Sequence, residues 1–192
     1  MSSAAVQTYL TPEEYLAWER KSDTKHEYVG GEIIAMSGAS YHHTLLTMNI
    51  SGEFYIQLKD TACTVHTNDM RVRTSPETSY FYPDILIVCG EPRFEDNTFD
   101  TLLNPIVLVE VLSPSTEAYD RGGKFKHYQQ LTSLREYILV SQDEVRVEHY
   151  QQQRTEWQPT EFRSLADVLS LTSIDCELSL EDIYRRVEFR EN

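Results

Sequence analysis

Two carboxylates occupy late positions in apolar segments of the sequence. Asp84 lies in the segment YPDILIV (82–88), and Glu110 lies in IVLVEVL (106–112). Removing an unpaired carboxylate from water costs several kcal/mol, so such a group usually has a cation, a hydrogen-bond network or a shifted pKa beside it. The pair therefore suggests a metal site. The alternative is an acidic residue at a strand end, capped by backbone N–H groups or paired with Arg.

The two carboxylates meet if their strands are neighbours. Alternation along a strand puts Glu110 on the same face as Leu108 and Leu112, with Val111 on the opposite face. Asp84 follows a proline, which lacks an N–H and suits a strand start or edge.

A helix after the second strand could cover this pair. Asp120, Lys124 and Tyr128 are each four residues apart and line one helical face. Lys124 is the candidate for an ammonium group at the site, and its alternative role is a surface lysine paired with Asp120. Tyr128 would pack its ring on the sheet and hold Lys124 or Glu110 with its hydroxyl.

Oxygen ligands favour Mg²⁺ or Mn²⁺ over zinc, since no Cys or His residues are grouped at zinc spacing. The chemistry that uses such a site is phosphodiester hydrolysis. The metal polarises a phosphoryl oxygen and lowers the pKa of an attacking water, while a nearby ammonium stabilises the added negative charge.

The remaining sequence predicts the elements that position these residues. Thr11-Pro12-Glu13-Glu14 predicts a capped helix start, and Gly30-Gly31 predicts a hairpin turn. Further helices are expected behind Ser40 and over residues 117–131, 165–169 and 180–186. Strands are expected over residues 63–73, 81–89 and 106–112, with an exposed loop over 90–104 and a late hairpin formed by 136–140 and 145–150.

Composition indicates one globular domain over residues 1–192. The hydrophobic content of 40% is enough to bury a core, and no repeat or low-complexity tract is present. Three cysteines without a Cys-x-x-Cys spacing support neither a disulfide framework nor a zinc knuckle, so we expect core cysteines in a reducing compartment. With no basic, apolar leader and no membrane-spanning stretch, we expect a cytoplasmic protein with no membrane partner.

The formal net charge of −14 limits the possible partners. Nucleic-acid binding rests on Lys and Arg displacing counterions, so the charge argues against free nucleic acid. A local basic face can still exist on an acidic protein, and its candidates are Arg71, Arg73, Arg121, Lys124, Lys126 and Arg135.

An ordered set of motifs along nearly the whole chain resembles the Uma2 family, a DUF820-type group of restriction-endonuclease-like proteins common in cyanobacteria. The set comprises LTPEEY (10–15), EYVGGE (27–32), His43 with Asn49, DMRV (69–72), YPD (82–84), and VEVLSPST (109–116) followed by Asp120, Lys124 and Tyr128.

The resemblance implies the PD-(D/E)XK nuclease fold, an α+β arrangement with a mixed central sheet flanked by helices and an N-terminal β-hairpin. It implies Asp84 and Glu110 as metal ligands, with the Val111 carbonyl as a third. Leu112 stands where the motif has lysine, and Lys124 resembles the migrated lysine of other family members. Glu27 is a further candidate carboxylate, and His43 is expected at the rim.

Three functions are compatible with these residues. The first is a Mg²⁺-dependent endonuclease that cleaves DNA with Asp84, Glu110 and Lys124, as a homodimer because duplex cleavage needs two strand attacks. The second is a nuclease-derived module that binds nucleic acid or protein with little turnover, which the acidic charge and displaced lysine permit. The third is a metal-dependent hydrolase of another substrate. Fold alone does not decide among them.

Overall fold

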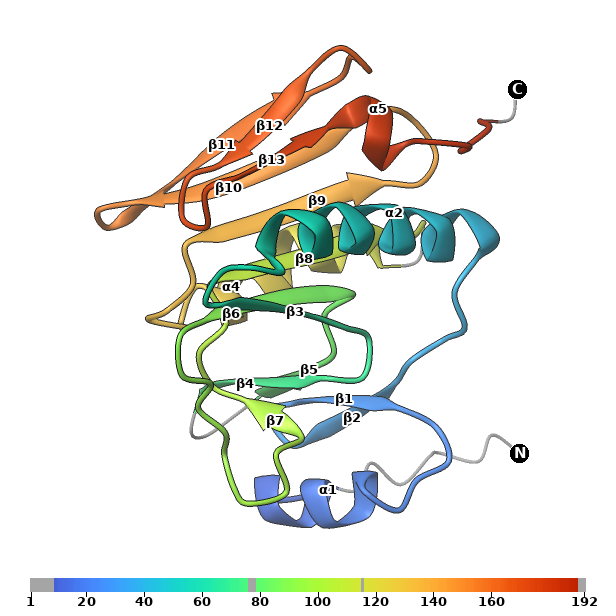
Figure 1. Cartoon of the computed structure of the whole chain (residues 1–192). Helices are drawn as coiled ribbons and strands as arrows, with labels where there is room; N and C mark the ends of the chain where they lie inside the picture. The colour runs from blue at the N-terminus through green and yellow to red at the C-terminus, as the bar shows by residue number, and fades with distance from the viewer. Residues whose placement is uncertain (1–8, 76–78, 115, 190–192) are drawn as a thin grey trace, which may run out of the picture.

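The computed structural model describes residues 9–75, 79–114 and 116–189, and its centre is a six-stranded sheet (Figure 1). The strand order is β11-β10-β9-β8-β6-β3, and the sheet is mixed because only the β8–β9 pair within it is parallel. Its strands are β3 (Cys63–Thr67), β6 (Ile85–Cys89), β8 (Val107–Leu112), β9 (Glu136–Ser141), β10 (Val147–Gln153) and β11 (Glu156–Phe162).

A five-stranded sheet of order β2-β1-β5-β4-β7 lies between the large sheet and the N-terminal helix (Figure 1). Its elements are α1 (Pro12–Glu19), β1 (His26–Val29), β2 (Glu32–Ala35), β4 (Arg71–Ser75), β5 (Ser79–Phe81) and β7 (Thr101–Leu102). The predicted capping box is confirmed, since Thr11 accepts from the Glu14 N–H and Glu14 accepts from the Thr11 N–H. The predicted hairpin is also confirmed, with Gly30 and Gly31 at φ values of 58° and 96° that favour glycine.

The helix α2 (Tyr41–Leu58) covers one face of the large sheet, opposite the face that packs against residues of the five-stranded sheet (Figure 1). Ser40 caps it by accepting the His43 N–H at 3.0 Å. The remaining elements are α3 (Glu117–Tyr119), the π-helical turn η1 (Asp120–Lys124), α4 (Phe125–Tyr128), β12 (Val168–Leu171), β13 (Cys176–Ser179) and α5 (Leu180–Ile183). Among the described residues, no helix combines the length and apolar character needed to cross a membrane.

The central strand β8 is buried along its whole length, and it is apolar at every position except Glu110. Val109 and Val111 contact the core under α2, whereas Leu108 and Leu112 contact the core shared with α4 and the five-stranded sheet. This is the predicted alternation. Glu110 therefore projects into the second core, where a charge needs partners.

Two predicted strands are each divided between sheets. Residues 63–73 form β3 and β4 in different sheets, because the chain turns at Asn68, whose φ is 31°. Residues 81–89 extend from the end of β5 into β6, with a break around Pro83, which cannot donate to a sheet ladder.

Three helix predictions are wrong in part or in full. The helix expected over residues 180–186 is α5, which ends at Ile183. The segment 117–131 is helical only to Tyr128 and contains the π-helical turn Asp120–Lys124. Residues 165–169 form no helix: Asp167 accepts the N–H groups of Arg163 and Ser164 in a turn, and the chain enters β12. Leu169 and Leu171 alternate with exposed residues, which is the period of a strand. Ser115, which belongs to a family motif, lies outside the described residues.

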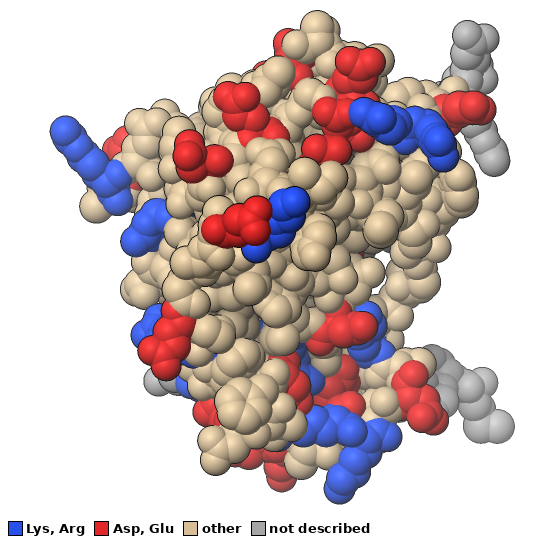
Figure 2. All heavy atoms as spheres, viewed as in Figure 1, with Lys and Arg blue, Asp and Glu red and all other residues tan. Residues whose placement is uncertain are grey.

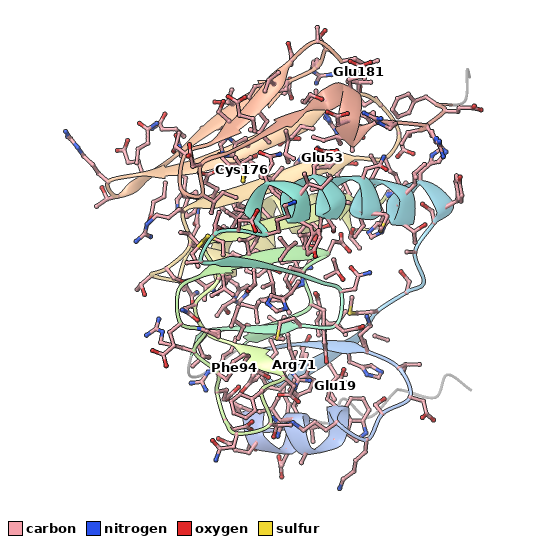
Figure 3. All side chains as sticks on the ribbon, viewed as in Figure 1. Glu19, Glu53, Arg71, Phe94, Cys176 and Glu181 are labelled. Carbon is pink, nitrogen blue, oxygen red and sulfur yellow. A yellow bond between two sulfur atoms is a disulfide. The ribbon has the colours of Figure 1, made fainter. Side chains whose placement is uncertain are left out.

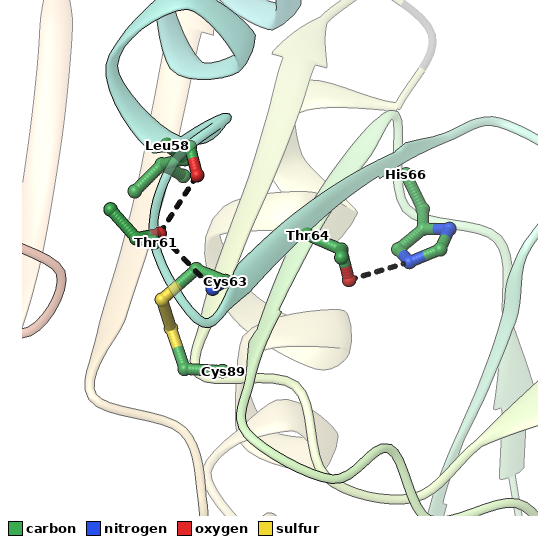
Figure 4. Close-up of a disulfide and its surroundings, with 6 residues drawn as sticks. All are labelled: Leu58, Thr61, Cys63, Thr64, His66 and Cys89. Carbon is green, nitrogen blue, oxygen red and sulfur yellow. Dashed lines mark hydrogen bonds between the residues drawn. A yellow bond between two sulfur atoms is a disulfide. The ribbon is translucent and has the colours of Figure 1, made fainter.

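The cysteine prediction is wrong for two of the three residues. Cys63 and Cys89 face one another across β3 and β6 and form a disulfide (Figure 4). The sequence does not predict this pairing, because the two cysteines are 26 residues apart and are brought together by the register between β3 and β6. Cys176 is free and buried, as predicted.

Removing this disulfide is expected to lower the free energy of unfolding. Closing a loop of this length restricts the unfolded chain by about 3 kcal/mol. The double variant Cys63→Ala/Cys89→Ala should show that loss in urea titrations, and Cys176→Ala, which removes no crosslink, is the control for loss of a buried thiol. Equal stability of the double variant and the oxidised wild type would contradict the crosslink.

Arg71 is buried between the five-stranded sheet and α1, near Glu19 (Figure 3). It donates to Thr101 Oγ1 at 3.0 Å and to the Tyr82 hydroxyl at 2.8 Å, and it pairs with Asp100 at 2.9 Å. Asp69, two residues earlier in the chain, pairs with Lys25 and not with Arg71. Arg71 is therefore a structural residue.

Asp100 should contribute pH-dependent stability through this network. The Arg20 guanidinium that donates to it, opposed by burial and helped by Arg71, lowers the pKa of Asp100 from 3.8 to about 2. A lowered folded-state pKa stabilises the fold above the unfolded value and loses that contribution as pH falls toward the folded value. Asp100→Asn should therefore lower the unfolding free energy by about 2 kcal/mol at about pH 7, with a smaller difference at about pH 3.

Urea titrations across this pH range measure the difference, and Asp69→Asn, on an exposed side chain, is the matched control. A constant gap between Asp100→Asn and wild type at all pH values would contradict the assignment.

Candidate active site

Asp84, directly before β6, and Glu110, in β8, belong to neighbouring strands, which is the condition for the two carboxylates to meet. The β6–β8 register pairs Ile85 with Val109, and its continuation sets Asp84 opposite Glu110. Asp84 Oδ2 accepts the Val111 N–H at 2.8 Å and contacts His43 Nε2 at 3.1 Å. The backbone capping considered as an alternative role for Asp84 is therefore present, on one of its two oxygens.

Glu110 is buried, and its Oε1 is held from the helical side. The Tyr128 hydroxyl donates to it at 2.8 Å, and Lys124 Nζ lies 2.9 Å away. The predicted contact of Tyr128 with Glu110 is present. Leu112, at the motif position for lysine, packs in the apolar core instead.

Lys124 lies at the centre of a carboxylate cluster formed by Glu27, Glu110 and Asp120. Its Nζ is 2.9 Å from Glu27 Oε1 and from Glu110 Oε1, and 3.8 Å from Asp120 Oδ1. Glu27 comes from β1, Glu110 from β8, and Asp120 and Lys124 from the π-helical turn. Asp120 keeps the predicted contact with Lys124 even though the turn is π-helical and not α-helical.

Burial and charge shift the pKa values of this cluster in a consistent way. Burial raises the pKa of Glu110 well above its ordinary value, although Lys124 opposes the rise. Burial would lower the pKa of Lys124, but Glu110, Glu27 and Asp120 outweigh it and raise that pKa well above its ordinary range. Burial likewise raises the pKa of Asp120. Lys124 therefore stays protonated, as the one ammonium among several carboxylates.

His43 joins the site from the first turn of α2. Burial acts to lower its pKa, but the hydrogen bond and charge of Asp84 outweigh burial, so the pKa of His43 is raised. Its Nδ1 is buried without a hydrogen-bond partner among the described residues. The structure thus brings His43 to Asp84 on the side opposite Lys124's helix.

Tyr119 and Tyr137 border the cluster and were missed by sequence reasoning. The Tyr119 hydroxyl is buried with no hydrogen-bond partner among the described residues, and its ring lies where a Cβ on Gly123 would collide with it. The Tyr137 hydroxyl donates to the Asp120 carbonyl at 3.1 Å. The Gly122-Gly123 pair was the available signal, since glycines in a helix often mark a close approach of another group.

The predicted basic face is not formed by the arginines nearest the site. Arg71 is buried, Arg73 pairs with Glu95, and Arg121 pairs with Glu117 and Glu148. Each guanidinium pairs with a carboxylate of the same chain. These arginines are therefore less available to bind DNA phosphates than the sequence suggested.

The donor set is compatible with a hard divalent cation. Within the part of the chain that the structure describes, no group of three or more His, Cys, Asp or Glu side chains could hold a metal ion by itself. Mg²⁺ often uses only one or two carboxylates and completes its shell with water. The contacts of Asp84 and Glu110 described above involve Oδ2 and Oε1, respectively, which leaves Oδ1 and Oε2 as possible metal ligands.

Comparison with known proteins places the chain in a family. The model of the Uma2 family, described as "Putative restriction endonuclease", matches residues 12–181. The chain therefore belongs to the Uma2 family. It is 37% identical over 181 residues to the uncharacterized protein slr1290 of Synechocystis sp., with 94% of each chain covered. It is 39% identical over 151 residues to the uncharacterized protein sll1609 of the same organism, covering 79% of this chain and 85% of that one.

The fold also matches a solved structure. A crystal structure described as a putative nuclease belonging to DUF820 from Anabaena variabilis superposes with a TM-score of 0.76 over 91% of this chain and 97% of that one. At 19% identity, this likeness shows the fold. The predicted fold class is thereby confirmed: a restriction-endonuclease-like mixed central sheet flanked by helices, with an N-terminal β-hairpin.

Proposed function

We propose that this chain is a divalent-metal-dependent endonuclease that hydrolyses phosphodiester bonds in DNA. The observation that carries the proposal is the Asp84–Glu110 pair on adjacent strands, with Lys124 Nζ 2.9 Å from Glu110. A lysine from the next helix thus supplies the ammonium that the Leu112 position lacks. Membership of the Uma2 family supports the same reaction class.

Asp84 and Glu110 would hold Mg²⁺ or Mn²⁺, with the Val111 carbonyl as a third ligand. When bound, the metal supplies a Lewis acid for the phosphoryl oxygen and lowers the pKa of a bound water. The excess of carboxylates over ammonium groups supports binding of a further cation, because uncompensated buried charge is costly.

The chain's other residues position these ligands. Tyr128 orients Glu110 by donating to Oε1, and the Val111 N–H and His43 orient Asp84 through Oδ2. Glu27 fixes the Lys124 ammonium from β1. In this arrangement, the protonated Lys124 stabilises negative charge that develops on the phosphate oxygens.

A nuclease-derived binding module is the second candidate. Lys124 is buried, and its ammonium forms ion pairs with Glu27 and Glu110 of the same chain, which favours a structural role for the ammonium. The net charge of −14 also opposes tight binding of DNA outside the site.

In this proposal the chain forms one domain and acts on DNA in the cytoplasm. Two copies form a homodimer, and each copy cleaves one strand of the duplex. The cytoplasm is proposed because DNA is the proposed substrate. Reduced cysteines no longer support this compartment, since Cys63 and Cys89 form a disulfide.

Cleavage of supercoiled plasmid DNA tests the function. Wild type should nick or linearise the plasmid with Mg²⁺ or Mn²⁺, and a chelator should stop it. Asp84→Asn should abolish cleavage while circular dichroism shows an intact fold, and Asp96→Asn, on an exposed loop, should cleave like wild type. A folded wild type that cuts no form of DNA with either metal would reject the endonuclease and favour the binding module.

A further inference from the structure

The strand β3 is an open edge of the large sheet. Among the described residues, only β6 pairs with it. Hydrogen bonds from Gly90 N–H to the Ala62 carbonyl and from Asn68 N–H to the Asp84 carbonyl fix which β3 residues face that neighbour. By alternation, the N–H and carbonyl of Val65 point away from β6. Neither group has a hydrogen-bond partner among the described residues.

This edge has none of the usual protections against strand pairing. The residues CTVHT (63–67) include no proline, lysine or acidic residue. Natural edge strands usually carry such residues or a bulge, because unpaired backbone groups are a template for another strand. The β3–β6 register is continuous and shows no bulge.

An apolar groove adjoins the same edge. Its volume is about 670 Å³, and Val65 and Thr67 line it together with Met48 and Tyr55 of α2 and with Phe99. Met48, Tyr55 and Phe99 are 70%, 66% and 61% exposed. Met48 and Tyr55 are seven residues apart, so they lie on one stripe of α2. Large apolar side chains beside an open strand indicate a contact surface.

Charge favours a second copy of this chain as the occupant. The chain carries a net charge of −14, so two copies repel one another across most of their surfaces. Charged side chains are sparse where Figure 1 places α2 and β3, although Figure 2 shows one acidic and one basic group together near the middle of this face; α2 carries one charged residue, Glu53, and β3 carries none. Two acidic residues, Asp69 and Asp100, line the groove, and its other lining residues carry no negative charge. Two copies can therefore meet here with less repulsion than elsewhere.

We propose that two copies of this chain associate through β3, edge to edge and antiparallel, about a two-fold axis at Val65. Such an edge is complementary to itself, because the Val65 N–H can donate to the carbonyl of the partner's Val65 and the reverse. The Thr67 N–H would then face the carbonyl of the partner's Cys63. The same axis places each Met48–Tyr55 stripe against the other copy and joins the two large sheets into one.

This proposal names a surface and does not depend on nuclease activity. A catalytically inactive protein would dimerise in the same way, and DNA cleavage by a protein that stays monomeric would reject the dimer without rejecting metal-dependent hydrolysis. Failure of the plasmid assay and failure of the dimer test are therefore distinguishable.

Sedimentation velocity on the full chain, over about a hundredfold range of concentration, tests the association. Wild type should shift from monomer to dimer. Met48→Glu should raise the dimer dissociation constant at least about tenfold, because symmetry puts two added charges into one apolar contact. Leu165→Glu, which adds the same charge on an exposed apolar residue outside the groove, should leave the dissociation constant unchanged.

Hydrogen exchange of wild type provides a readout that needs no variant. The Val65 and Thr67 amides should exchange more slowly as concentration rises, whereas the His66 amide, which faces β6, should not change. A monomer at every concentration would overturn the proposal and favour a different partner for the groove. So would a dimer in which Met48→Glu and Leu165→Glu behave alike and the Val65 amide stays unprotected, because that dimer would use another surface.

Discussion

Lys124→Met is expected to lower the free energy of unfolding by about 3–5 kcal/mol at neutral pH. The substitution keeps most of the side-chain volume but leaves Glu27, Glu110 and Asp120 without the ammonium that lies among them. Uncompensated buried carboxylates then have to be desolvated or protonated for the chain to fold. Urea titration of the purified protein measures the loss.

The stability loss of Lys124→Met should depend on pH. Burial already raises the pKa of Glu110 and Asp120, and without the opposing ammonium these two carboxylates take up protons more readily in the folded state than in the unfolded chain. Raised folded-state pKa values add stability at low pH that is lost as pH rises through them. The deficit of Lys124→Met relative to wild type should therefore shrink as pH falls from about 7 to about 5.

Two comparisons make this result specific. Lys126→Met, two residues away on an exposed side chain, should cost little, because solvent-exposed charges contribute about 1 kcal/mol or less. Added Mg²⁺ should stabilise Lys124→Met more than wild type, since a divalent cation can replace the lost charge. If Lys124→Met is as stable as Lys126→Met, the buried ion cluster does not exist in solution.

Glu110→Gln is expected to slow DNA cleavage by at least about a thousandfold, because it removes a charged metal ligand. The fold should survive, since the glutamine carbonyl can still accept the Tyr128 hydroxyl and a neutral amide is less costly to bury than a carboxylate. Single-turnover cleavage at fixed Mg²⁺ measures the rate.

A matched carboxylate variant controls for general damage in that experiment. Glu95→Gln removes a partly buried charge that contacts Arg73 and Tyr80, away from the cluster. It should lose stability but retain cleavage. A Glu110→Gln rate within about tenfold of wild type would mean that Glu110 is not a metal ligand in the reaction.

The sequence predicted the carboxylate site better than it predicted the elements around it. Asp84 and Glu110 were placed by strand alternation and by their apolar flanks, both of which are local signals. Lys124 was placed by its spacing from Asp120, and the contact formed although the turn is π-helical. Local patterns were therefore enough to predict which of these side chains meet, and their roles in a reaction stay a prediction.

The failures concern contacts between distant segments. The Cys63–Cys89 disulfide and the Arg71–Asp100 pair depend on strand register and on loop return, which no local pattern encodes. The division of residues 63–73 between two sheets depends on a single turn at Asn68. Glu27 is a different case, because it was proposed from family resemblance and does contact Lys124. That contact also joins distant segments, the N-terminal hairpin and the π-helical turn, so no local pattern predicts it.

A calorimetric titration with Mn²⁺ tests the central claim most directly, since it asks whether Asp84 and Glu110 hold a divalent cation. Wild type should bind Mn²⁺ with a measurable heat at millimolar concentration or below, and Asp84→Asn/Glu110→Gln should show no binding while remaining folded. Absence of binding by folded wild type, or equal binding by the double variant, would contradict the metal site and the endonuclease built on it.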